Sequence, residues 1–109
     1  MERTAHKRES FGEIIKGSTP VLVDFFAEWC GPCKLMKPIL EELHIRMGNK
    51  VRILKIDIDK SPAAANTLQI QSVPTLMLFQ HGKTVWRKSG VVQATQLEKI
   101  IEQFITNDN

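Results

Sequence analysis

Hydrophobic residues along the chain gather in short runs, and the first of these have the pattern of β-strands. Residues 21–27 (VLVDFFA) form a nearly continuous apolar run, which is typical of a strand buried on both faces. Residues 51–58 (VRILKIDI) alternate between apolar and polar side chains, as a strand does. Segments 75–80 and 83–89 flank His81-Gly82, a two-residue hairpin signal. We therefore predict strands in these segments, with a tight turn joining the last two.

The segments between and after these strands have the spacing of helices. A short helix over 10–16 begins with Ser10 as its cap, and a longer one over 33–47 ends at Gly48. Ser61-Pro62 fits the cap and first position of a further short helix. One apolar face of a closing helix is formed by Leu97, Ile100, Ile101, Phe104 and Ile105. This order of elements predicts one α/β domain, a mixed sheet flanked by helices on both faces.

Length and charge restrict the class of protein. A chain of 109 residues holds one domain, and 42% hydrophobic with 25% charged residues is typical of a globular protein. The formal charge of +3 is spread along the chain without a basic block, so a solvated surface is favoured over a nucleic-acid interface. Residues 1–12 lack the apolar run of a signal peptide, and no stretch is long enough to span a bilayer. If Met1 is the native start, we expect a cytoplasmic protein.

Both cysteines lie in one short loop, Cys30-Gly31-Pro32-Cys33. A disulfide that closes so short a loop restrains the unfolded chain little, because this stabilisation grows with loop length. The loop follows a buried strand and precedes a helix, a place where α/β sheets expose functional groups. The positive end of the helix dipole and its unpaired N–H groups favour a thiolate there. The pair therefore predicts redox chemistry.

The two cysteines are expected to have different roles. Cys30 precedes the helix and is the better nucleophile, whereas Cys33, in the first turn, is expected to be more buried and to attack a mixed disulfide formed at Cys30. Gly31 and Pro32 allow the turn and start the helix. Two inert buried cysteines are an alternative that this loop disfavours. A zinc site would need further ligands, and no paired spacing exists among the histidines, which are His6, His44 and His81.

An aspartate interrupts the apolar run of residues 21–27. Aspartate is rarely buried without a partner, so Asp24 should hold its proton more tightly than a free aspartate does. An outward-facing Asp24 on a half-exposed strand is the alternative, which its apolar neighbours disfavour.

Residues 29–34 (WCGPCK) resemble the active-site signature of the thioredoxin family, and residues 23–28 (VDFFAE) continue the match. The similarity extends over about residues 10–104. It implies a thioredoxin-like fold with a central four- or five-stranded mixed sheet, and reduction of disulfides in other proteins through Cys30 and Cys33. It also implies a monomer that binds no cofactor and no membrane, re-reduced by a thioredoxin reductase that uses NADPH and FAD.

The resemblance also assigns residues around the cysteines. Asp24 resembles the family's buried acid, exchanging a proton with Cys33, and Lys55 resembles the lysine near it. Val73-Pro74 resembles the cis-proline loop, although trans is the default for the residues alone. Gly90 resembles a glycine at the border of the substrate groove, and a simple strand terminator is equally compatible with it. The implied substrate-binding residues are Trp29, Gly31, Pro32, Val73, Pro74, Gly90 and Val91.

The sequence departs from the family pattern at two places. Two other functions also remain possible for this fold. Ser89 falls where an apolar residue is common, which would alter the groove. Residues 1–9 are unlike the family's first strand, so we expect that strand to be truncated or missing, or the segment to be poorly ordered, and residues 106–109 to be a polar tail. An oxidase or isomerase shares the fold, and a partner-binding module would show only incidental turnover. Gly-Pro between the cysteines favours the reductant.

Overall fold

The computed structural model describes residues 10–105. The expectations for residues 1–9 and 106–109 lie outside this range. The helices are α1 (Phe11–Ile14), α2 (Gly31–Met47), α3 (Pro62–Thr67) and α4 (Ala94–Ile105), and a 3-10 turn, η2 (Gly48–Lys50), follows α2. The strands are β1 (Val21–Phe26), β2 (Arg52–Asp57), β3 (Thr75–Gln80) and β4 (Lys83–Ser89).

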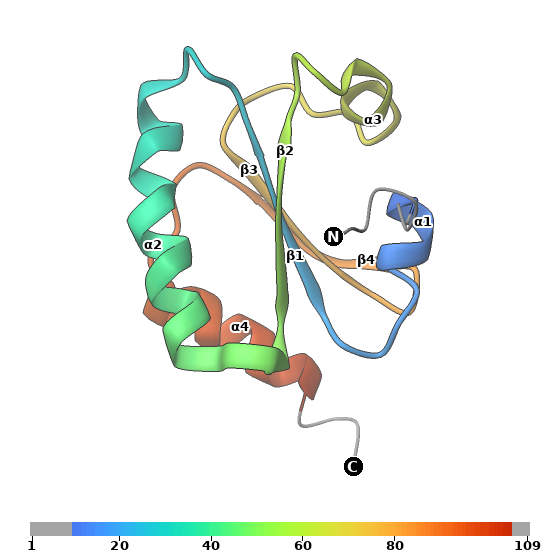
Figure 1. Cartoon of the computed structure of the whole chain (residues 1–109), viewed down its shortest axis with the longest axis vertical. Coiled ribbons are helices and arrows are strands. Elements are labelled where there is room, and N and C mark those ends of the chain that lie inside the picture. Colours follow the sequence, from blue (N-terminus) through green and yellow to red (C-terminus); the bar gives the residue numbers. More distant parts are fainter. Residues whose placement is uncertain (1–9, 106–109) are drawn as a thin grey trace, which may run out of the picture.

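The strands form one mixed sheet in the order β2-β1-β3-β4. Strand β1 pairs parallel with β2 and antiparallel with β3, and β3 pairs antiparallel with β4. Helices α2 and α4 lie on one side of the sheet, and α1 and α3 lie on the other (Figure 1). This arrangement confirms the predicted α/β fold with helices on both faces.

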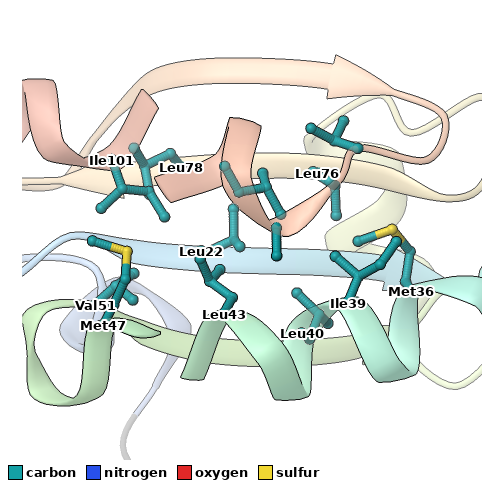
Figure 2. Close-up of a cluster of buried hydrophobic side chains, with 13 residues drawn as sticks. Leu22, Met36, Ile39, Leu40, Leu43, Met47, Val51, Leu76, Leu78 and Ile101 are labelled. Atoms are coloured by element: carbon teal, nitrogen blue, oxygen red, sulfur yellow. The ribbon is translucent and has the colours of Figure 1, made fainter. Parts of the chain in front are cut away.

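Burial of β1 on both faces explains its unbroken apolar sequence. On one face, Leu22 meets Leu43 of α2 and Leu97 of α4, and none of the three is exposed to solvent. Figure 2 shows side chains of α2 pointing toward those of the sheet in this layer. On the other face, the Phe11 ring of α1 packs edge-on against Phe79, with the ring centroids 5.2 Å apart. The two layers cover β1 on both faces, and the loop that follows β1 leads to the cysteines.

Local signals set the ends of the elements close to where they were predicted. Ser10 caps α1, because its Oγ accepts the Glu13 N–H at 3.2 Å while the Glu13 carboxylate accepts the Ser10 N–H at 3.1 Å. The helix ends at Ile14, earlier than expected. His81 and Gly82 have φ angles of 55° and 79°, the positive values that a tight hairpin turn requires. In residues 10–105 no helix has both the length and the apolar character needed to cross a membrane.

Candidate active site at the start of helix α2

Cys30 occupies the N-cap position of α2, directly after the loop that leaves β1. Its Sγ accepts the backbone N–H of Cys33 at 3.2 Å, and the two side chains form a disulfide with their Cα atoms 5.3 Å apart. The helix begins at Gly31, two residues before the predicted start, because Cys30 supplies the cap and Pro32 fits the first turn. Once the disulfide is reduced, this N–H and the helix dipole favour negative charge on the Cys30 sulfur.

The expected order of burial of the two cysteines is wrong. Cys30 is 4% exposed and Cys33 is 7% exposed, so Cys33 is not the more deeply buried of the two. Ala27 and the half-buried side chains of Phe26 and Val73 pack against the pair. The physical difference between the cysteines is therefore the capping position of Cys30 and not its exposure.

Asp24 lies on β1 and is fully buried. Neither of its carboxylate oxygens has a hydrogen-bond partner among the described residues. Burial raises the pKa of this carboxyl from 3.8 to about 6, and the positive charge of Lys55 lowers it by a smaller amount. Asp24 and Lys55 are paired in the register of β1 and β2. A carboxyl group with this pKa changes charge close to neutral pH.

A hollow of about 190 Å³ opens beside Cys33 and has room for a few water molecules. Lys55 lines it, and its Nζ lies 5.1 Å from the centre of the Phe26 ring. Lys55 and Cys33 thus line the same hollow. A larger hollow of about 800 Å³ lies between α2 and β2, and neither cysteine is part of its lining.

The Val73–Pro74 peptide bond is cis, and its loop lies against the cysteines. The Val73 carbonyl oxygen is 3.6 Å from the Cys30 Sγ. Gly90 donates its N–H to the Pro74 carbonyl at 2.8 Å. Its φ of 97° is a conformation that side-chain-bearing residues rarely adopt, which explains a glycine at this position.

Exposed apolar side chains flank the disulfide. Trp29 is 69% exposed and Val91 is 36% exposed, while Pro32 is exposed and Val73 half-buried. The cis-proline loop contacts the cysteine pair, and the segment after β4 reaches that loop through the Gly90 N–H. Trp29 and Pro32 therefore leave exposed apolar surface next to the cysteine pair.

Asp59 is a site residue that sequence analysis missed. Its Oδ2 accepts a hydrogen bond from the Trp29 indole Nε1 at 2.9 Å, across 30 residues of sequence. The Asp59 N–H is itself bound to the Asp57 carboxylate at 2.9 Å. The only signal in the sequence was that an indole N–H usually has an acceptor, which does not identify the partner. Within residues 10–105 no group of three or more metal-ligating side chains occurs.

Comparison with known proteins agrees with this geometry. The family model described as Thioredoxin matches residues 2–103. A thioredoxin-like protein of Synechocystis is 50% identical over 97 residues, which cover 88% of this chain and 92% of the relative. The bifunctional thioredoxin reductase/thioredoxin of Mycobacterium leprae is 38% identical over 99 residues, 91% of this chain and 22% of that protein. The crystal structure of oxidised mitochondrial thioredoxin 3 from Saccharomyces cerevisiae superposes with a TM-score of 0.76 at 36% identity, covering 85% of this chain and 86% of that one.

A paired C-x-x-C at the start of a helix, on a mixed sheet of this order, defines a thiol–disulfide oxidoreductase. The chain belongs to the thioredoxin family. Its activity is the reduction of protein disulfides by thiol–disulfide exchange.

Proposed function

We propose that Cys30 is the attacking thiolate and Cys33 the resolving thiol of this exchange. In the first step the Cys30 sulfur attacks one sulfur of a substrate disulfide, and the other sulfur leaves as a thiolate. In the second step Cys33 loses its proton and attacks Cys30, which releases the second substrate thiol and closes the Cys30–Cys33 disulfide. The observation that carries this assignment is the N–H of Cys33 bound to the Cys30 Sγ at the helix N-cap.

Asp24 is the acceptor for the Cys33 proton in this mechanism. Its pKa of about 6 lets it take up and release a proton close to neutral pH, whereas an exposed aspartate would stay ionised. Lys55, which pairs with Asp24 in the β1–β2 register, lines the hollow beside Cys33, and this hollow has space for water. Lys55 limits how far the pKa of Asp24 is raised. We therefore assign Asp24, with Lys55 beside it in the sheet, to the proton transfer of the resolving step.

Recycling of the disulfide is assigned to a thioredoxin reductase that carries FAD and takes electrons from NADPH. The fused reductase and thioredoxin of Mycobacterium leprae supports this partner, because its name joins the two activities in one protein. The reductant role suits a reducing compartment, and we place the protein in the cytoplasm, acting as a monomer.

Insulin reduction with dithiothreitol tests the proposed roles. The wild-type protein is expected to accelerate the precipitation of reduced insulin chains, and Cys30→Ser is expected to abolish this acceleration. Acceleration that survives in Cys30→Ser would overturn the mechanism. A wild-type protein that binds insulin without accelerating its reduction would show a partner-binding module instead.

A second arm replaces dithiothreitol by NADPH and a bacterial thioredoxin reductase. Consumption of NADPH that depends on this protein and on insulin supports the reductase partner. Activity with dithiothreitol but none with the reductase would overturn the assignment of thioredoxin reductase as the recycling partner. It would leave the exchange mechanism intact.

A further inference from the structure

Three hydroxyl groups meet beside the Val73–Pro74 loop. Ser72 and Thr75 flank the loop, and Ser89 ends β4 directly opposite Thr75 in the β3–β4 register. The Ser89 Oγ lies 3.3 Å from the Ser72 Oγ and 3.2 Å from the Thr75 Oγ1. The Thr75 Oγ1 donates to the Ser72 carbonyl at 2.7 Å.

The number of protons fixes the direction of these hydrogen bonds, because each hydroxyl can donate only one. Thr75 gives its proton to the Ser72 carbonyl, so Ser89 donates to Thr75, and Ser72 donates to Ser89. The three bonds form a chain that starts at the Ser72 side chain and returns to the Ser72 backbone. Ser89 takes part in two of the three bonds, whereas the Ser72 hydroxyl takes part in one.

These hydrogen bonds among Ser72, Thr75 and Ser89 fix the backbone on one side of Val73, and Gly90 fixes it on the other. The Ser72 carbonyl is held through Thr75 and Ser89, and the Pro74 carbonyl accepts the Gly90 N–H at 2.8 Å. The Val73 carbonyl lies between these two and is 3.6 Å from the Cys30 Sγ. The end of β4 therefore ties down the loop segment that borders the reactive sulfur.

We propose that Ser89 is a positioning residue that holds the Val73–Pro74 loop for polypeptide substrates. A polypeptide that brings its disulfide to Cys30 must pass along Val73, because Val73 contacts the sulfur and is partly exposed. A small aromatic disulfide needs only the sulfur itself. The hydroxyl chain thus raises reactivity toward polypeptide disulfides over small ones. This inference rests on the exchange mechanism proposed above, with Cys30 as the attacking sulfur.

A matched pair of variants isolates the hydroxyl. Valine and threonine have nearly the same shape and both suit a strand, so Ser89→Val and Ser89→Thr differ mainly in the hydrogen-bonding group. Thr84→Val makes the same kind of change at an exposed position earlier on β4 and serves as a control. The second-order rate constants of the reduced proteins are measured with insulin and with 5,5′-dithiobis(2-nitrobenzoate), without a reductase.

The Ser89→Val variant is expected to react about fivefold more slowly with insulin and at an unchanged rate with the small disulfide, as the loss of two hydrogen bonds suggests. Ser89→Thr and Thr84→Val are expected to react at the wild-type rate with insulin and with the small disulfide. Ser72→Ala, which breaks one bond, is expected to fall between wild type and Ser89→Val with insulin, and it provides the test if Ser89→Val unfolds.

Equal rate constants of Ser89→Val and Ser89→Thr with insulin would overturn the proposal. So would a decrease in the rate constant of Ser89→Val that is the same for insulin and for the small disulfide. A wild-type protein that reacts with neither disulfide would instead overturn the exchange mechanism. The two failures are therefore distinguishable.

Discussion

Replacing Asp24 by asparagine should stabilise the protein at neutral pH by an amount that depends on pH. The folded-state pKa of about 6 lies above the ordinary value of 3.8, so the native state binds this proton more tightly than the unfolded state does. The resulting stability is fully present below about pH 4 and is lost as the pH rises through about 6. A difference of about two pKa units corresponds to about 3 kcal/mol. Asparagine has nearly the same shape and cannot ionise, so the variant does not lose this stability.

The measurement is the free energy of unfolding in urea for wild type and Asp24→Asn between pH 4 and pH 8, with the disulfide intact in both. The advantage of the variant over wild type should grow by about 2.5 kcal/mol across this range, mostly between pH 4 and 6. Comparing the two pH values removes any constant cost of burying the amide. Glu41→Gln on the exposed side of α2 is the control and should stay within about 0.5 kcal/mol of wild type at both ends. If the difference in free energy of unfolding between Asp24→Asn and wild type does not change with pH, then desolvation does not raise the pKa of Asp24 and the reasoning is refuted.

Further variants test the core, the first helix cap and the indole contact. Leu43→Ala should lower the free energy of unfolding by about 2–5 kcal/mol, because Leu43 is fully buried in the layer between α2 and the sheet. Leu35→Ala, which removes a side chain 59% exposed on the same helix, should cost far less, and equal losses in urea unfolding would contradict the packing. Ser10→Ala should cost about 1 kcal/mol through loss of the capping bonds, and no change would show that the cap is not formed in solution. Asp59→Ala should speed hydrogen exchange at the Trp29 indole N–H in NMR spectra, since its acceptor is lost, and an unchanged exchange rate would rule out this bond.

Sequence patterns predicted the fold because they report on local geometry and burial. The apolar run of residues 21–27 indicated a strand covered on both faces, and β1 is such a strand. His81-Gly82 indicated a tight hairpin, because that turn requires positive φ angles. The apolar neighbours of Asp24 favoured a buried side chain over an outward-facing one, and Asp24 is fully buried.

Contacts between distant segments were beyond the reach of these patterns. No periodicity connects Trp29 with Asp59, since both lie in loops and the bond depends on how the ends of β1 and β2 come together. Ser89 was recognised as unusual, but its partners Ser72 and Thr75 become apparent only from the turn that precedes β3. The burial order of the cysteines was wrong because position in a helix does not determine what covers a side chain from other elements.

The most direct test of the central claim is whether each cysteine can trap a substrate. Cys33→Ser and Cys30→Ser are reduced, mixed with oxidised insulin at neutral pH, quenched with acid, and analysed by mass spectrometry for a covalent adduct. If the Cys30 sulfur at the N-cap of α2 attacks and Cys33 resolves, Cys33→Ser should accumulate a mixed disulfide through Cys30, because the second step is blocked. Cys30→Ser should form little or no adduct. An adduct formed mainly by Cys30→Ser, or to the same extent by both variants, would contradict the assignment of the attacking sulfur.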